Sequence, residues 1–200
     1  MSLEVDATVA ERVDNPGGFQ HLDGATKDGR YLVFASAPPR PEVWIQRVGN
    51  PAERRALVKG DGEFAAWQGR VSPDGRWLAF TLGRSLRPEV FVQPFDRPGK
   101  RLQVSRGRAF GPIWRADSRE LYYEAPDALM AVTMTERDGA LQAGTPQKLF
   151  SLRTQGLIAN QPHNVEVAAN GQKFIVNALV GDGDNTPLEV TLNCAAGLKK

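Results

Sequence analysis

A tight turn followed by a short apolar run recurs four times along the chain, and this repeat constrains the fold more than any other feature. In the clearest copy, residues 71–80, Ser-Pro-Asp-Gly precedes Arg-Trp-Leu-Ala-Phe. Proline fixes one turn dihedral, aspartate can bond its own backbone, and glycine tolerates a positive φ. The turn anchors, which are 46, 43 and 53 residues apart, are Asp28, Asp74, Asp117 and Asn170. Self-similarity at this period indicates a repeat architecture.

A second internal match supports the repeat. Residues 40–46 (Arg-Pro-Glu-Val-Trp-Ile-Gln) and 87–93 (Arg-Pro-Glu-Val-Phe-Val-Gln) agree in residue type at every position, at a spacing of 47. Both segments follow a turn and an apolar run, so they occupy the same place in consecutive repeats. Chance is therefore a poor explanation for the repeat.

Strands are expected throughout, because no segment carries apolar residues at helical spacing over three turns and turn signals interrupt each apolar run. Four short antiparallel strands in about 45 residues are typical of a β-propeller blade. The predicted fold is therefore all-β, a propeller of four-stranded antiparallel blades with about four blades in this chain. We expect a single domain over 1–200, with blades at 18–60, 61–107, 108–153 and 160–198 and an N-terminal segment at 1–17.

Each of the first three blades should hold four strands. We expect them at 19–25, 31–34, 42–46 and 55–58, at 64–71, 77–80, 87–93 and 101–104, and at 112–114, 121–123, 129–134 and 148–151. The last blade should have strands at 164–168, 173–177 and 187–194, with no evident fourth strand. The positions three before and four after each anchor are apolar, as packing between blades requires: Ala25, Val71, Trp114 and Val167, then Leu32, Leu78, Leu121 and Phe174.

Composition excludes several classes of protein. The chain has 25 basic and 23 acidic residues, a net charge of +2, and no dense basic run, so we predict no nucleic-acid partner. Cys194 is the single cysteine and forbids an internal disulfide. No apolar run approaches the roughly 20 residues of a membrane span. The N-terminus lacks a signal-peptide pattern, and the compartment stays open at this point.

Residues 72–80 followed by 89–95 resemble the TolB-like propeller repeat, a broadly WD-like repeat that lacks the Gly-His and Trp-Asp marks of the WD type. A closer resemblance covers residues 64–200. It rests on the segments 92–95, 103–105, 114–115, 120–123, 130–132 and 192–198. These segments are similar to the C-terminal propeller of bacterial multidomain proteins, which often have an N-terminal serine/threonine kinase domain and sometimes a winged-helix DNA-binding domain.

The chain departs from the family pattern at three turns. Residues 25–27 replace an aromatic-Ser-Pro sequence, Ser118 replaces glycine, and Asn170 replaces aspartate. Such propellers usually have about six to eight blades. Three arrangements are therefore open: an open fragment, a ring completed by another copy, and a four-bladed ring closed by a strand at 4–13. We favour the four-bladed ring, whereas an open array would expose an apolar blade face and favour dimerisation.

No catalytic motif stands out. The sequence has no Gly-x-Ser-x-Gly, His-Glu-x-x-His, phosphate-loop or kinase motif, and its two histidines are His21 and His163. The acidic loop 182–186 has alternating oxygen donors but lacks the later glycine and glutamate of a calcium loop. The anchor aspartates are expected to cap turns. We therefore predict no catalytic residue, no cofactor and no metal.

Two features are candidates for partner binding. One is a basic stretch that could attract an anionic or protein partner, and the other is a histidine at the start of an inner strand. The candidate residues are Arg97, Lys100, Arg101, Arg106, Arg108 and His163. The alternative for the basic stretch is a solvated face, and the alternative for His163 is a structural or exposed histidine. The four tryptophans are expected to pack in the core.

The favoured function is a non-catalytic module for protein–protein interaction or ligand sensing, as the C-terminal part of a larger bacterial signalling protein. The specific ligand or protein partner stays open, and a periplasmic location is favoured over the cytoplasm. One alternative is a propeller hydrolase or lyase with a carboxylate site in the central channel, and another is a TolB-like periplasmic partner protein. Charged groups with perturbed pKa values in the channel would favour the enzyme, and a neutral channel would favour the scaffold.

Overall fold

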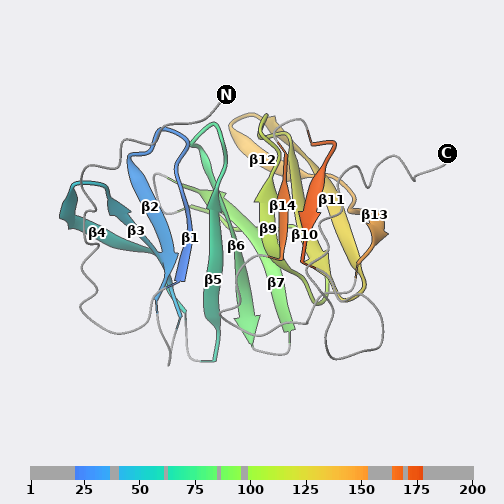
Figure 1. The fold of residues 1–200 in the computed structure, drawn as a ribbon, viewed down its shortest axis with the longest axis horizontal. Helices are drawn as coiled ribbons and strands as arrows, with labels where there is room; N and C mark the ends of the chain where they lie inside the picture. Colours follow the sequence, from blue (N-terminus) through green and yellow to red (C-terminus); the bar gives the residue numbers. More distant parts are fainter. Residues whose placement is uncertain are drawn as a thin grey trace.

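The computed structural model describes residues 21–36, 41–60, 63–84, 87–95, 99–152, 164–168 and 171–177. All regular structure in these ranges is β-strand, and the strands form antiparallel sheets that follow one another as blades (Figure 1). No helix long and apolar enough to cross a membrane occurs in this part of the chain. The all-β propeller fold predicted from the repeat is confirmed.

The first two blades are four-stranded meanders in chain order. Blade 1 consists of β1 (His21–Ala25), β2 (Tyr31–Ala35), β3 (Val43–Arg47) and β4 (Asn50–Val58). Blade 2 consists of β5 (Ala65–Val71), β6 (Trp77–Arg84), β7 (Arg87–Pro94) and β8 (Leu102–Gln103). The register repeats as well, because Leu32 lies opposite Gln46 in blade 1 and Leu78 lies opposite Gln93 in blade 2.

The matching segments 40–46 and 87–93 have a shared structural role. The carbonyl oxygen of Pro41 accepts a hydrogen bond of 2.9 Å from the N–H of Ala66, and that of Pro88 accepts one of 2.9 Å from Ala109. Pro88 lies in the third strand of blade 2 and Pro41 lies two residues before that of blade 1, while Ala66 lies in the first strand of blade 2 and Ala109 directly precedes that of blade 3. The repeat thus encodes the junction between blades as well as the blades themselves.

Blade 3 departs from the four-strand pattern. Its strands are β9 (Phe110–Trp114), β10 (Glu120–Ala125), β11 (Ala128–Arg137), β12 (Ala140–Ala143) and β13 (Gln147–Ser151). The long strand β11 pairs with β10 along one edge, and along the other its first part pairs with β13 and its last part with β12. Asp138 and Gly139 join β11 to β12 with φ of 52° and 74°, the pair of positive values that a type I′ hairpin requires. The sequence predicts this turn but not β12, since Ala-Leu-Gln-Ala has little strand propensity.

Blade 4 is described only for its first two strands, β14 (Val165–Val167) and β15 (Phe174–Val176), which pair with each other. The strands expected at 187–194 and 4–13 lie outside the described residues. The blade boundaries, the single domain and the closure of the ring therefore stay predictions.

The four turns share one backbone geometry. In the second turn the N–H of Gly75 donates to the Ser72 carbonyl at 2.8 Å, and equivalent bonds of 2.8 to 2.9 Å recur in the other three. The fourth residue of the turn has φ of 70° at Gly29, 75° at Gly75 and 69° at Gly171. Ser118 takes the same place in blade 3 with φ of 61°. A side chain is therefore held in the left-handed region that glycine occupies without strain.

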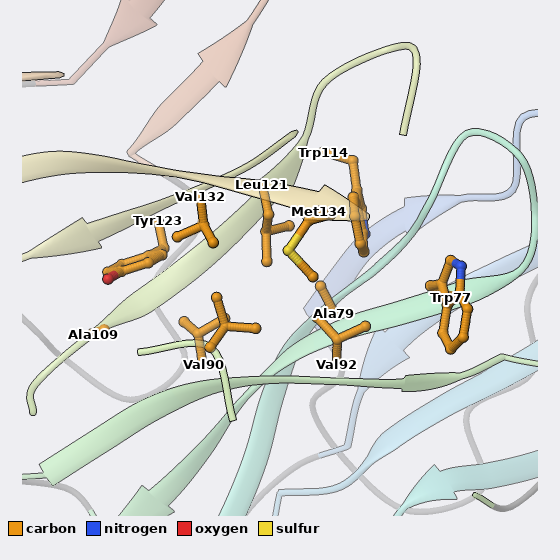
Figure 2. Close-up of a cluster of buried hydrophobic side chains, with 11 residues drawn as sticks. Trp77, Ala79, Val90, Val92, Ala109, Trp114, Leu121, Tyr123, Val132 and Met134 are labelled. Carbon is orange, nitrogen blue, oxygen red and sulfur yellow. The ribbon is translucent and has the colours of Figure 1, made fainter. Parts of the chain in front are cut away.

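The core lies between the blades. Figure 2 shows the cluster at the junction of blades 2 and 3, where Val90 and Val92 of β7 face Leu121 and Val132 of blade 3. A second cluster joins blades 1 and 2, and a third joins blades 3 and 4. Each is made of apolar side chains from two sheets, so neither blade could bury its face alone.

The residue four positions after each anchor packs against the preceding blade. Leu78 lies in the cluster with blade 1, Leu121 in the cluster with blade 2, and Phe174 in the cluster with blade 3. Leu32, the equivalent in blade 1, is only half-buried and has no preceding blade within the described ranges. The predicted packing role of this position holds wherever the preceding blade is described.

Candidate functional site at the mouth of the central channel

The first strands of the blades run along the middle of the molecule (Figure 1). β1 contacts β5, β5 contacts β9, and β9 contacts β14. The first three of these strands are irregular, with register shifts at Leu22/Gly24 in β1, at Trp67/Arg70 in β5, and in β9 opposite Tyr122/Glu124. Such bulges re-aim side chains and are frequent next to functional sites.

One position of the repeat lines a cavity between the first strands of the four blades, which we call the channel mouth. The residue four before each anchor is Gly24 in blade 1, Arg70 in blade 2, Ile113 in blade 3 and Glu166 in blade 4. All four line a cavity of about 150 Å³. The neighbouring residues three before the anchors also line it: Ala25, Val71, Trp114 and Val167. The repeat thus brings one site together from four blades.

Arg70 and Glu166 form an ion pair across this mouth. The Arg70 Nη2 donates to the Glu166 Oε1 at 2.5 Å, and the two side chains are 23% and 54% exposed. The pair links blade 2 to blade 4. A Cβ added at Gly24 would lie 3.4 Å from the Arg70 Nη1, so β1 passes within van der Waals contact of the guanidinium. The apolar residues Val33, Ile113 and Trp114 form much of the remaining wall.

A second charged pair, His21 and Asp23, stands on β1. Asp23 is 3% exposed, and its Oδ2 accepts a hydrogen bond of 2.8 Å from the N–H of Gly69. Its Oδ1 lies 3.4 Å from the His21 Nδ1. Burial raises the pKa of Asp23, opposed by His21 and the Gly69 N–H, while the hydrogen bond with Asp23 raises the pKa of His21. The Arg70 guanidinium lowers the pKa of both groups.

Buried polar side chains connect consecutive blades near these bulges. Asp23 reaches the Gly69 N–H, and the Gln68 Oε1 accepts a hydrogen bond of 2.9 Å from the N–H of Gly111. The Glu124 Oε2 accepts a hydrogen bond of 3.3 Å from the Asn164 Nδ2. Each of these hydrogen bonds crosses a blade junction. They pair buried polar groups that would destabilise the fold if they had no hydrogen-bond partner.

The predicted binding residues separate in the structure. Lys100 and Arg101 line a groove between blades 2 and 3, where the Arg101 Nε donates to the Gln93 Oε1 at 3.3 Å. Arg106 and Arg108 are exposed and do not line that groove. Arg97 and His163 lie outside the described residues. The structure therefore brings together two of the six predicted residues.

Sequence reasoning missed the charged residues of the channel. A signal was available, because Gly24, Arg70, Ile113 and Glu166 hold one repeat position and differ in chemical type. The repeat is recognised by the apolar positions that all blades share, and this variable position is not one of them. Among the described residues, no group of three or more histidine, cysteine, aspartate or glutamate side chains could hold a metal ion. The channel mouth instead offers the Arg70 guanidinium and the Glu166 carboxylate beside apolar residues, while His21 and Asp23 on β1 do not line the cavity.

The strand order, the bulged inner strands and the packing between blades define the blades of a β-propeller. No protein-family model matches the sequence, and comparison with curated protein sequences finds no significant match. Solved structures with the same fold include a TolB candidate from Agrobacterium tumefaciens, which is 16% identical with a TM-score of 0.53 over 69% of this chain and 51% of that chain.

Two further structures have similar scores. TolB from Acinetobacter baumannii is 16% identical with a TM-score of 0.52, over 88% of this chain and 41% of that chain. An oligogalacturonate lyase in complex with manganese is 11% identical with a TM-score of 0.53, over 74% of this chain and 42% of that chain. This chain spans about half the length of these proteins or less. At these identities the likeness establishes the fold, which serves both a TolB protein and an enzyme.

Proposed function

We propose that this chain is a non-catalytic binding module whose channel mouth holds a carboxylate-bearing ligand or partner group against Arg70. The observation that carries the proposal is the ion pair of Arg70 with the half-exposed Glu166 at a cavity whose wall includes Val33 and Ile113. An incoming carboxylate can take the place of the Glu166 carboxylate on the guanidinium, because a planar guanidinium binds carboxylates through paired N–H donors. Apolar atoms of the ligand would then contact Val33 and Ile113.

Benzoate is a suitable probe for this site. A dry apolar cavity of about 150 Å³ holds one benzene ring, and the channel-mouth cavity has about that volume. Benzamide has the same shape without the charge. We expect benzoate to bind the full chain in calorimetric or NMR titrations, and benzamide to bind at least about tenfold more weakly.

Variants of the ion pair test the assignment. Arg70→Gln should weaken benzoate binding about tenfold or more, because it removes the charged donor. Glu166→Gln should strengthen binding, because it removes a competing charge. The matched control is Arg76→Gln, which breaks the Arg76–Glu136 pair between blades 2 and 3 away from the cavity. Equal binding of benzoate and benzamide, or equal effects of Arg70→Gln and Arg76→Gln, would refute the carboxylate site.

One observation favours a second candidate function, a channel enzyme. His21 and Asp23 are paired close to Arg70, and their pKa values are both raised, an arrangement that suits proton transfer. A lyase acting on acidic sugars would use the histidine as base and the guanidinium to hold a uronate. The test is incubation of the chain with oligogalacturonate and manganese, followed by ultraviolet absorbance of the unsaturated product. A rate that His21→Gln abolishes would replace the binding-module proposal with the enzyme.

The wider setting is also part of the proposal. We place the module at the C-terminus of a larger bacterial signalling protein in a periplasmic or other extracytoplasmic location. The support is the resemblance of residues 64–200 to propellers of bacterial multidomain proteins and the TolB-like repeat. The sequence of the complete gene checks this setting directly. A parent with no further domain and no export signal would refute it.

A further inference from the structure

A groove separate from the channel runs between blades 2 and 3. Its floor contains Trp77, Pro94 and Leu102 of blade 2, and its opposite wall contains Leu141 of β12. The groove has a volume of about 380 Å³, more than twice that of the channel-mouth cavity at about 150 Å³. A second hollow of about 510 Å³ also borders Trp77 and Leu141, but Asp74, Asp117 and Glu136 line it, so it is not part of the groove. The groove itself is mostly apolar, as a site for the apolar side chains of a bound peptide requires.

The wall of the groove exists because blade 3 has the additional strand β12. The hairpin turn at Asp138 and Gly139 brings Gly139, Ala140 and Leu141 opposite the edge of blade 2. Among the described strands, β8 pairs only with β7 and β12 pairs only with β11. Two edge strands therefore flank the groove, and an edge strand has backbone groups that an extended segment can pair with.

The charge on the rim is one-sided. Lys100 and Arg101 line the groove, and none of the described residues that line it is an aspartate or glutamate. Arg101 contacts Gln93 and lies over the Phe80 ring with its guanidinium carbon 5.7 Å from the ring centre. No described carboxylate forms an ion pair with Lys100 or Arg101. A negatively charged group would therefore meet two cations whose charge this part of the chain does not neutralise.

We propose that this groove binds an extended, acidic peptide segment of a partner protein. An apolar side chain of the segment would lie on Trp77 and Leu141, carboxylates would face Lys100 and Arg101, and the peptide backbone would run along the edge strands. The proposal is independent of the channel mouth, which shares none of the residues that line this groove. It assigns a function to the additional strand β12 of blade 3.

The test uses the full chain and a fluorescent ten-residue peptide of alternating glutamate and leucine. Its controls are a peptide of alternating lysine and leucine and a peptide of glutamate and glycine. We expect saturable binding of the first peptide in fluorescence polarisation, with the glutamate–glycine peptide at least about tenfold weaker because it buries no apolar side chain. The lysine–leucine peptide should show no saturable binding.

Two double variants separate the groove from general charge attraction. Lys100→Glu with Arg101→Glu should weaken the glutamate–leucine peptide about tenfold or more. Arg106→Glu with Arg108→Glu changes the net charge equally at exposed residues outside the groove, and should weaken binding less than about twofold. Ala140→Trp fills the groove from the exposed end of β12 and should also block binding, whereas Lys148→Trp on β13 should not.

Three outcomes would overturn the proposal. The first is the absence of binding by the glutamate–leucine peptide at millimolar concentration. The second is equal loss in the two double variants, which would mean nonspecific attraction. The third is equal binding of the glutamate–glycine peptide, which would mean a polyanion site without an apolar subsite. Circular dichroism of each variant shows whether the fold is retained, and Ala140→Trp tests the groove with no change in charge.

Discussion

Two positions of the repeat, one on each side of the turn, have opposite characters. The residue four after the anchor is leucine or phenylalanine in every blade, and Leu78, Leu121 and Phe174 are 0%, 0% and 3% exposed between blades. The residue four before the anchor is glycine, arginine, isoleucine or glutamate, and it faces the channel mouth. The first position must fill a fixed volume between two sheets, so its chemistry cannot vary. The second borders open space, so the fold sets its place and leaves its chemistry available for function.

The largest expected effect tests the packing side of this contrast. Leu121→Ala should lower the free energy of unfolding by about 2–5 kcal/mol, because the side chain is enclosed between blades 2 and 3. Ile113→Ala, at the channel position of the same blade, should cost less, since its side chain borders an existing cavity. Urea unfolding of both variants measures the difference. Equal losses would remove the distinction between the two positions in blade 3.

The turn between these positions offers the next largest effect. Gly75 has φ of 75°, and Gly75→Ala should cost about 1 kcal/mol, because an L-residue is strained in this region. Ser118→Gly relieves the same strain in blade 3 but loses the hydrogen bond of 3.1 Å that the Ser118 hydroxyl accepts from the Asp74 N–H. We expect Ser118→Gly to be neutral or stabilising by less than about 1 kcal/mol. Thermal unfolding checks the signs, and destabilisation by both substitutions would contradict the account.

The same contrast explains how far the sequence predicts the molecule. The repeat predicts the β1 to β11 meander, because apolar residues and turn residues recur where packing and backbone geometry require them. It does not predict β12, which depends on a two-residue turn and on an open edge of β11. It also does not single out Arg70 and Glu166. Their proximity depends on how blades 2 and 4 are placed across the channel, and no local pattern contains that distance.

A smaller effect is expected for the pH dependence of stability. The pKa of His21 is raised by Asp23, so the folded chain holds this proton more tightly than the unfolded chain. The resulting stabilisation is present below the ordinary value of 6.5 and is lost as the pH rises through the raised value. The pKa of Asp23 is also raised, so its contribution to stability likewise decreases as the pH rises from the ordinary value of 3.8. Stability should therefore fall as the pH rises from about 6.5 through the raised pKa of His21.

A histidine-matched pair of variants checks this slope. His21→Gln should remove most of the decline above pH 6.5, the ordinary pKa of the group. His163→Gln is the control, because His163 stands seven residues before its turn anchor, as His21 does. Urea unfolding at several pH values gives the slope for each. If the decline survives His21→Gln and disappears in His163→Gln, the titrating group is His163, and the assignment to His21 is wrong.

The smallest effect on stability is expected at the channel ion pair itself. Arg70 and Glu166 lie at a solvent-accessible mouth, where an ion pair contributes at most about 1 kcal/mol. A double-mutant cycle of Arg70→Gln and Glu166→Gln should therefore give a small coupling energy that decreases with salt. The same Arg70→Gln substitution should change benzoate binding about tenfold. Arg70 would then contribute little to folding and much to binding, as the contrast between the two repeat positions requires. A coupling energy of several kcal/mol would instead make the pair a structural link between blades 2 and 4.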